Sequence, residues 1–348
     1  MNRYIDINVP PGKRIPNTKE FGALLLSNNV QDDYCWINNY GCFTTKSKDA
    51  LFVVQTSDEH FSLLPGPEFL PRLYRGQTGF HNKCVPLLFR EPITQINYLT
   101  GLLKKYEFYK LMAGHPIIRY LQGWFIDGKY FKIDMEGISA HYEFMTPLLD
   151  FTRSKDIAMF FAVCEKNEDN LYRPIIDESR DVVLYTVDLV ALLGNNNSYF
   201  NVIGFQALPR PDVQMAYSLV MGYKENLNLF PFITYEIFKV NRKQSEKYFD
   251  LFEGGAKLFP NDIVDDMSLE IKQSLEIDRE VLQFCFEKHL IPNSWANISE
   301  VENFLKRFNY KVTDKCLKFT DELRSKIVEK WNANPPLYPA RVKCRFVS

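Results

Sequence analysis

The chain has 348 residues, of which 46% are hydrophobic and 15% aromatic, and its formal net charge is −1 at pH 7. This composition excludes a disordered chain and supplies enough apolar side chains for a sizeable core. A net charge near zero gives the whole molecule no strong attraction to one class of partner. The length predicts two structural units, or one large unit with appendages.

No stretch approaches the roughly 18 to 20 consecutive apolar residues of a membrane span. The first residues, Met1 to Asp6, begin no apolar segment typical of a signal peptide. The seven cysteines form no Cys-x-x-Cys pair, and the five histidines do not have metal-ligand spacing. We therefore expect a cytoplasmic protein with free thiols, no membrane contact and no metal site.

Residues 1–45 are interpreted as an N-terminal lead-in, because they contain Pro10-Pro11-Gly12 and only short apolar runs. Denser patterning begins at Val53. A helix is predicted over 94–113, where Thr94 suits an N-cap and apolar residues recur at helical spacing.

A second helix is predicted over 154–165, where one face is apolar and includes Phe160 and Phe161, interpreted as core residues. The β-branched and aromatic runs at 182–187 and 233–240 predict strands.

After about residue 260 the pattern becomes helical. Ser299 to Glu302 match a capping box before an apolar face. Thr320 suits the cap of a last helix, which Pro335-Pro336 would end.

Charge separates along this region. Residues 261–300 hold three basic and nine acidic side chains, a net charge of −6, whereas 302–348 hold eleven basic and five acidic ones, a net charge of +6. Two interpretations stay open: helical faces that pair with each other or with solvent, or a basic tail over 302–348 that contacts nucleic acid or an acidic partner.

Two motifs place polar residues directly beside apolar runs. Residues 73–77 read LYRGQ and residues 86–90 read PLLFR. Residues 141–152 read HYEFMTPLLDFT, and AMFFA follows at 158–162. A charge in such a setting needs a partner when it is buried, so we expect it at a sheet edge or pocket floor. The residues predicted to meet in one pocket are Arg75, His141, Asp150 and Thr152.

These residues resemble the FRG domain family. Its pattern runs (F/Y)-R-G-Q, then P-S-L-x-R, then H-x-G-x-x-T-x-L-L-D-(W/F)-T with a helix ending A-x-x-F-A, and later R-x-x-x-Q-x-G. Arg210 and Gln214 match the late motif, and the resemblance covers roughly residues 60 to 272. The chain departs from the pattern at three positions: Glu143 replaces a usual glycine, Pro147 a usual arginine and Ala216 the late glycine.

The resemblance and the strand-like runs imply an α+β fold with mixed, largely antiparallel sheets and an ADP-ribosyltransferase-like core. The FRG domain is expected over 46–275, with the helix after Thr152 packed on the sheet. A helical C-terminal region is expected over 276–348.

FRG domains are distantly similar to ADP-ribosyltransferases, so the resemblance implies NAD as a substrate. The residues given catalytic roles are Arg75, His141, Asp150 and Gln214. Those given cofactor-binding roles are Tyr74, Arg75, Gly76, Gln77, Tyr142, Thr146 and Thr152. An arginine offers planar bidentate donors to phosphate or ribose, a helix N-terminus offers N–H groups, and Gly76 would let a ligand approach the backbone.

Structural alternatives exist for the same residues. Arg75 could pair with Asp150 as a buried salt bridge, and Asp150 could cap the following helix. His141, Tyr142 and Gln214 could be interior, packing and surface or structural residues.

Two functions therefore stay open. One is an ADP-ribosyltransferase or NAD glycohydrolase, acting as an effector in conflict with phage or a rival. The other is a non-catalytic module that binds a nucleotide or a partner. The protein or nucleic-acid target cannot be identified from the sequence.

Overall fold

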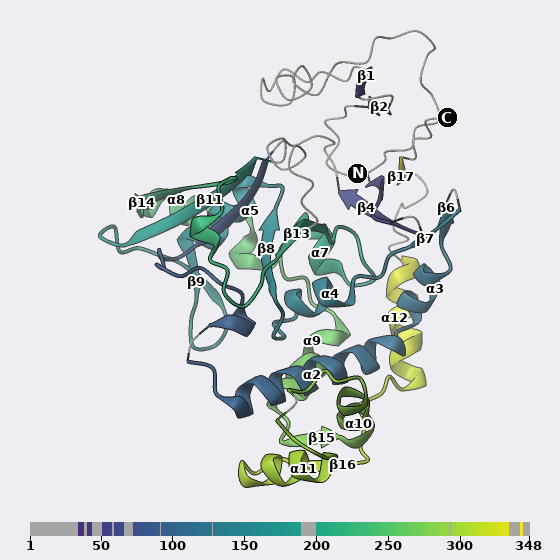
Figure 1. The fold of residues 1–348 in the computed structure, drawn as a ribbon. Helices are drawn as coiled ribbons and strands as arrows, with labels where there is room; N and C mark the ends of the chain where they lie inside the picture. The colour runs from purple at the N-terminus through teal and green to yellow at the C-terminus, as the bar shows by residue number, and fades with distance from the viewer. Residues whose placement is uncertain are drawn as a thin grey trace.

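The computed structural model describes residues 34–37, 40–43, 51–57, 59–65, 72–90, 92–126, 128–188, 200–292, 294–333 and 342–343. At its centre lies a six-stranded antiparallel sheet with the strand order β12-β13-β8-β5-β11-β14 (Figure 1). Its strands are β5 (Arg72–Gln77), β8 (Leu148–Thr152), β11 (Asp181–Asp188), β12 (Phe200–Val202), β13 (Ala216–Val220) and β14 (Ile233–Lys239).

A second sheet has the order β17-β3-β4-β7-β6 and mixes parallel with antiparallel pairs. Its strands are β3 (Leu51–Gln55), β4 (His60–Pro65), β6 (Phe125–Ile126), β7 (Lys129–Phe131) and β17 (Val342–Lys343). Among the described residues there are also three two-stranded pairs: β1 (Tyr34–Ile37) with β2 (Tyr40–Phe43), β9 (Cys164–Lys166) with β10 (Tyr172–Pro174), and β15 (Glu276–Asp278) with β16 (Lys311–Thr313).

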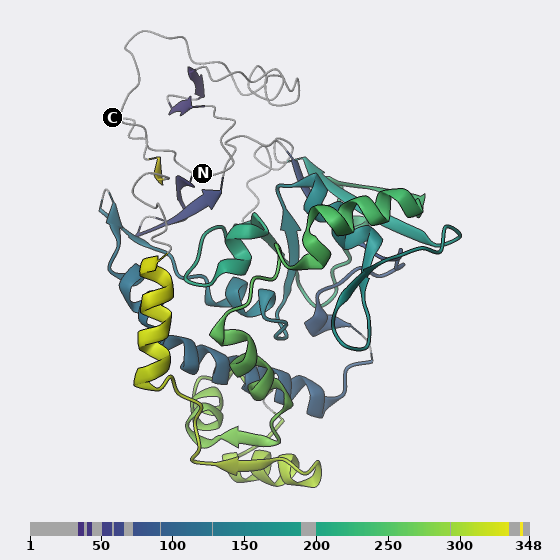
Figure 2. The same ribbon diagram turned by 180° about the vertical axis from the view of Figure 1, so that it is seen from behind.

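Helices surround the central sheet and extend away from it (Figures 1 and 2). The α-helices are α2 (Gln95–Ala113), α3 (Pro116–Gln122), α4 (Met135–His141), α5 (Lys155–Val163), α7 (Pro209–Val213), α8 (Arg242–Leu251), α9 (Ile263–Gln273), α10 (Arg279–Glu287), α11 (Ile298–Arg307) and α12 (Asp321–Ala333). Short 3₁₀ segments in the described ranges are η1 (Leu87–Phe89), η2 (Leu227–Leu229) and η3 (Glu253–Gly255). The mixed, largely antiparallel α+β fold class is confirmed.

The predicted helices and strands form close to their expected positions. Thr94 caps α2 by accepting a hydrogen bond from the Asn97 N–H at 3.3 Å. The second predicted helix is shorter than expected, because the backbone becomes extended at Cys164, where β9 begins. The predicted strands at 182–187 and 233–240 are confirmed as β11 and β14.

The C-terminal region needs one correction. Asn297, not Ser299, caps α11, since its side chain accepts from the Glu300 N–H at 3.1 Å. The region holds the helices α10, α11 and α12, and it also contains the parallel pair β15 and β16.

Thr320 caps α12 by accepting from the Leu323 N–H at 3.2 Å. The predicted stop at Pro335-Pro336 lies outside the described residues, as does most of the lead-in 1–45.

Two hydrophobic clusters sandwich the central sheet. On one face, α5 and α8 pack on β11 through Phe160, Val182 and Tyr248; Figure 2 shows α8 in front of the strands. On the other face, Leu73, Phe151, Tyr185 and neighbouring side chains form the second cluster. The central sheet is therefore buried on both faces around β5 and β8.

The long helix α2 joins the central domain to the C-terminal segment. Phe108 and Met112 pack in a core shared with α4 and α9, whereas Leu99 and Leu103 pack against α10 and α11. Lys104, buried among these helices, donates from Nζ to the carbonyls of Ile271 and Ser274 at the end of α9. Cations favour helix C-termini, so this lysine ties α9 to α2.

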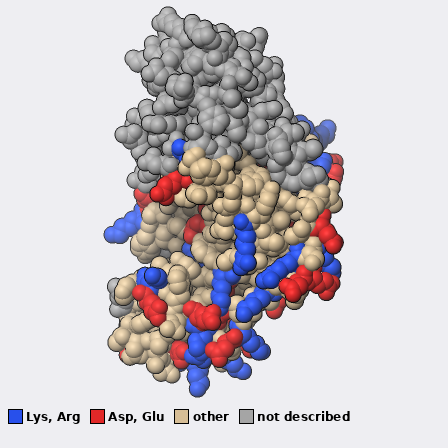
Figure 3. Space-filling model, turned by 90° about the vertical axis from the view of Figure 1, so that its right-hand side faces the viewer, with Lys and Arg blue, Asp and Glu red and all other residues tan. Residues whose placement is uncertain are grey.

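Charges in the C-terminal segment often meet a partner nearby. Lys326 pairs with Glu322 at 2.6 Å and Arg324 with Asp321 at 3.4 Å, all on α12. Figure 3 shows acidic and basic side chains interspersed on the lower half of one face. Both members of each of these pairs belong to 302–348, so they leave the net charge of that range unchanged. Lys315 pairs with Glu276 of the acidic range at 3.5 Å. Contact of 302–348 with nucleic acid stays a prediction.

No helix in the described ranges combines the length and the apolar character needed to cross a membrane.

Gly76 on β5 provides a sharp test of this packing. A Cβ built on Gly76 would lie 1.8 Å from the Ala158 carbonyl oxygen on α5, whereas Gly79 has open space around it. Because the obstructing atom is backbone, we expect Gly76→Ala to lower the free energy of unfolding by about 3 kcal/mol or more. Gly79→Ala should change it by less than about 0.5 kcal/mol. Denaturant unfolding of both variants checks this, and equal stabilities would contradict the β5–α5 contact.

Candidate functional site

A pocket opens where β5 and β8 separate. These neighbouring strands share one bridge, between Tyr74 and Thr152. Beyond it the ladder stops, and Nη1 of Arg75 donates to the Asp150 carbonyl oxygen at 2.8 Å. The cavity between the strands has a volume of about 790 Å³. Ligand pockets typically have volumes of about 300–1,000 Å³, so this one can hold a nucleotide-sized ligand.

The structure brings most of the sequence-predicted site residues to this pocket. Those that line it are Tyr74, Arg75, Gly76, Gln77, His141, Asp150, Thr152 and Gln214. They come from β5, β8, the end of α4 and the residue after α7. Their chemical roles stay predictions.

Tyr142 and Thr146 do not line the pocket. The Tyr142 side chain is fully buried, and its hydroxyl donates to the Asp262 carboxylate. Thr146 is also buried, and its hydroxyl oxygen accepts from the Leu148 N–H at 3.4 Å. Both side chains make structural hydrogen bonds, and their predicted contact with a ligand stays a prediction.

Gly76 lines the pocket and also has a packing role. Its missing side chain admits the backbone of α5, as the short distance from a built Cβ to the Ala158 carbonyl oxygen shows, and its contact with a ligand stays a prediction. The residue therefore fixes the pocket wall.

Three buried polar atoms in the pocket lack a hydrogen-bond partner within the described residues. They are Nε of Arg75, Nε2 of His141 and Oδ1 of Asp150. Buried polar atoms are nearly always hydrogen-bonded, since an unpaired one costs about 1–3 kcal/mol. Their convergence in one cavity marks the pocket as a site for a polar ligand.

Neither structural alternative for Asp150 is found. Its carboxylate makes no ion pair with Arg75, which bonds the backbone carbonyl instead. The cap of α5 is Ser154, whose side chain accepts from the Ile157 N–H at 3.4 Å. The carboxylate is thus not committed to holding the fold together.

The Thr152 hydroxyl is partly committed. Its oxygen accepts from the Ser154 N–H at 3.0 Å, in the turn between β8 and α5. Together with the Ser154 cap, this turn reduces the number of N–H groups that the start of α5 can offer to a phosphate.

His141 is the last residue of α4, and its side chain is 6% exposed. Burial lowers its pKa below the ordinary value of 6.5, although the nearby Asp150 carboxylate opposes this effect. The imidazole is therefore neutral near pH 7. A neutral ring can accept a hydrogen bond from a ligand hydroxyl.

Gln214 lies beside His141 and is buried. Its Nε2 donates to the Leu258 carbonyl oxygen at 2.9 Å. This bond ties the residue after α7 to the segment that leads into α9, so one N–H of the amide already has a structural role.

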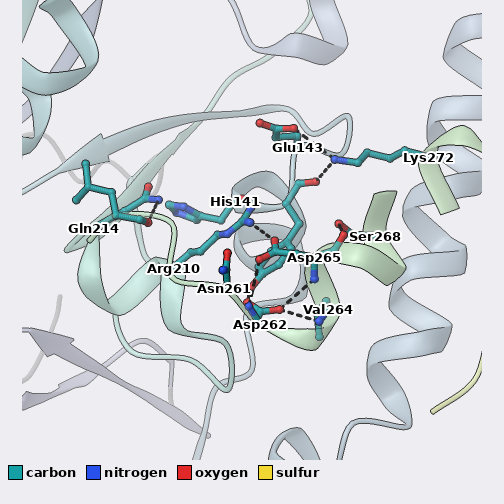
Figure 4. Close-up of polar contacts among 12 residues, drawn as sticks. His141, Glu143, Arg210, Gln214, Asn261, Asp262, Val264, Asp265, Ser268 and Lys272 are labelled. Atoms are coloured by element: carbon teal, nitrogen blue, oxygen red, sulfur yellow. Dashed lines mark hydrogen bonds and ion pairs between the residues drawn. The ribbon is translucent and has the colours of Figure 1, made fainter. Parts of the chain in front are cut away.

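Arg210, the arginine of the late motif, positions the end of α4 (Figure 4). Its Nη1 donates to the His141 carbonyl at 3.1 Å, and its Nη2 pairs with Asp265. The guanidinium also lies 4.3 Å from the centre of the Tyr142 ring. Asp265 belongs to the capping box of α9 with Asp262. One arginine thus links α4, α7 and α9 behind the pocket.

Glu143 has a left-handed backbone, with φ of 65°. Glycine adopts this conformation without strain, which explains the glycine in the family pattern. Here the carboxylate pairs with Lys166 on β9 and, at 3.4 Å, with Lys272 on α9. Burial would raise the pKa of Glu143, but these two ammonium groups hold it below its usual value.

Sequence reasoning left several pocket residues without a role. Arg90 is the arginine of the PLLFR segment, so the family pattern could have identified it as a pocket residue. Phe161 was interpreted as a core residue but lines the cavity, and Lys166 and Tyr172 come from the β9–β10 hairpin, which has no distinctive sequence signal. Within the described residues, no three metal-ligating side chains gather at a common point.

The fold and the site together define the class of protein: an α+β domain with a polar pocket between two diverging strands. The model of the FRG domain matches residues 71–171, and the chain therefore carries an FRG domain. The match contains β5, β8 and α5, whereas Arg210 and Gln214 lie beyond it. No curated protein and no solved structure matches the chain.

The strain at Glu143 can be measured with a matched pair of variants. Glu143→Ala and Glu143→Gly both remove the two ion pairs, but only alanine keeps the unfavourable left-handed backbone. We expect the glycine variant to be more stable by roughly 1 kcal/mol in denaturant unfolding. An alanine variant as stable as the glycine variant would contradict the positive φ.

The buried histidines predict a loss of stability in acid. His115, like His141, is buried, and this burial lowers its pKa to about 4. In the unfolded chain both groups titrate near 6.5, so the unfolded state takes up protons first as the pH falls. The stability from neutral histidine is complete above about pH 7 and declines as the pH falls toward the lowered folded values. Between pH 7 and pH 5 we expect His115 alone to reduce the free energy of unfolding by about 2 kcal/mol.

Denaturant unfolding over this pH range measures the effect. His115→Gln and His141→Gln should each flatten the pH dependence, whatever they do to stability at pH 7. An unchanged slope in either variant would show that the pKa of this histidine is the same in the folded and the unfolded protein.

Proposed function

We propose that this protein is an ADP-ribosyltransferase-like enzyme that binds NAD in the pocket between β5 and β8. The observation that carries the proposal is the convergence of unpartnered atoms of Arg75, His141 and Asp150 on one cavity. The distant similarity of FRG domains to ADP-ribosyltransferases supports NAD as the ligand.

The residues fit the groups that NAD presents. Arg75 has a free N–H for a phosphate or ribose oxygen, beside the one it gives to Asp150. The Phe161 and Ile157 side chains provide an apolar wall on α5 for a planar ring. The cavity volume of about 790 Å³ falls within the usual range for ligand sites.

The chemistry of such an enzyme is a glycosyl transfer. Breaking the bond between nicotinamide and ribose develops positive charge on the ribose, as in glycoside hydrolysis. In this mechanism the Asp150 carboxylate stabilises that charge or holds the ribose 2′-hydroxyl. The neutral His141 accepts a hydrogen bond from a ribose hydroxyl. The acceptor is water in a glycohydrolase and a target side chain or base in a transferase.

A non-catalytic nucleotide-binding module is the second candidate. Gln214 stands where many transferases carry glutamate, and one N–H of its amide is held by the Leu258 carbonyl. An amide cannot act as a general base, so this substitution favours binding without turnover.

Release of nicotinamide from NAD distinguishes the two candidates. We expect the wild-type protein to release it and Asp150→Asn to be slower by about 100-fold or more, because the variant keeps the shape but loses the charge. Asp150 makes no fold-stabilising ion pair, so the variant should unfold at a similar denaturant concentration. Asp181→Asn, on β11 and paired with Lys239 at the surface, is the matched control and should keep full activity.

If wild-type protein binds NAD without releasing nicotinamide, in the presence of candidate protein and nucleic-acid targets, the binding-module candidate replaces the enzyme. If Asp150→Asn keeps full turnover, Asp150 has no part in the chemistry.

A further inference from the structure

Two arginines face the same pocket from different parts of the chain. Arg75 lies on β5, and Arg90 follows η1; both line the cavity. Nε of Arg75 has no partner. The Arg90 guanidinium likewise makes no hydrogen bond or ion pair with another described residue. The pocket thus holds the unpartnered guanidinium of Arg90 and that of Arg75, whose Nη1 donates to the Asp150 carbonyl while its Nε has no partner.

The two guanidinium groups are close enough to influence one another. Although much of the Arg90 side chain is exposed, its pKa is lowered, first by partial burial and then by the positive charge of Arg75. Asp150 acts in the opposite direction on Arg90. Two cations near one carboxylate leave a net positive charge at this end of the pocket, which an anion would neutralise.

The shape of the two guanidinium groups indicates which class of anion they bind. A guanidinium binds phosphate through two parallel N–H groups, and two of them suit two linked phosphates better than one. The apolar side chains of Ile157 and Phe161 lie on the α5 wall of the same cavity, where a ring attached to the diphosphate can pack.

We propose that Arg75 and Arg90 together clamp the diphosphate of a nucleotide, so that Arg90 selects nucleoside diphosphates over neutral nucleosides. The inference rests on the proposed nucleotide pocket and adds Arg90 as the residue that sets the ligand class. With the diphosphate held there, a ribose beyond it lies toward Asp150 and His141.

Calorimetric titration at one fixed salt concentration tests the clamp with four probes: ADP-ribose, ADP, inorganic pyrophosphate and adenosine. We expect the wild-type protein to bind ADP-ribose and ADP at least tenfold more tightly than adenosine. Arg90→Gln should weaken ADP-ribose, ADP and pyrophosphate by roughly tenfold to hundredfold and leave adenosine unchanged. Arg90→Lys keeps the positive charge but loses the two parallel N–H donors of a guanidinium. Its affinity for the diphosphate probes should therefore lie between the affinities of the wild-type protein and Arg90→Gln.

Arg242→Gln is the matched control, because Arg242 is an exposed arginine on α8 that pairs with Glu246. It should bind all four probes like the wild-type protein. Thermal unfolding of each variant shows whether it is folded, and the exposed position of Arg90 predicts an unchanged melting temperature.

Failure of the clamp and failure of the enzyme proposal give different results. Diphosphate binding that depends on Arg90 without nicotinamide release supports the clamp and removes the enzyme. Nicotinamide release with ADP-ribose affinity unchanged in Arg90→Gln supports the enzyme and overturns the clamp. A wild-type protein that binds none of the three diphosphates, or binds adenosine as tightly as ADP, also overturns it.

Discussion

The contact between Gly76 and the backbone of α5 is the constraint on which the pocket depends. α5 follows β8 after a two-residue turn, and it is pressed against β5 through Gly76. The helix therefore sets the distance between the two strands from one side. With the strands bridged only at Tyr74 and Thr152, the space beyond that bridge is left for the Arg75 side chain and for a ligand. A side chain at position 76 would move the helix and change the shape of the cavity.

A second constraint comes from behind the pocket. Arg210 bonds the backbone of His141 and the first turn of α9, while Tyr142 bonds the Asp262 side chain that caps the same helix. Arg210, Tyr142, Asp262 and Asp265 are thus linked to one another behind the pocket, although Nε of Arg210 lacks a partner. The unpaired atoms of Arg75, His141 and Asp150 belong to residues that line the cavity, where a ligand can reach them.

Structural features that depend on neighbouring residues in the sequence were predicted better than features that depend on contacts between distant parts of the chain. Thr94 and α2, and the β-branched run of β11, carry local signals and were predicted nearly to the residue. The cap of α11 was misplaced because Ser299 also starts a capping-box pattern, only two residues after Asn297. The three-residue strands β15 and β16 are too short for periodicity to indicate.

Only part of the pocket was predicted, because some of its residues depend on contacts with distant parts of the chain. Motif residues identified most of its wall, but the role of Gly76 depends on a backbone atom of a distant helix, and Gln214 is held by the distant Leu258 carbonyl. Neither partner can be inferred from spacing along the chain.

The substitution at Glu143 shows how a chain can depart from a family pattern without losing the geometry that the pattern encodes. A glutamate at φ of 65° costs roughly 1–2 kcal/mol in backbone strain relative to glycine. Its two ion pairs are partly exposed, and such pairs contribute about 0–1 kcal/mol each, so they offset the strain only in part. Stability alone therefore does not account for the residue. The partner Lys166 lines the pocket, and the ion pair fixes this lysine on the β9–β10 rim. The charge that Lys166 brings to the pocket is thus paired with Glu143, whereas Arg75, Arg90 and Lys83 are further cations of its lining. The glutamate at position 143 therefore changes the electrostatics of the cavity and keeps the left-handed backbone that a glycine would adopt there.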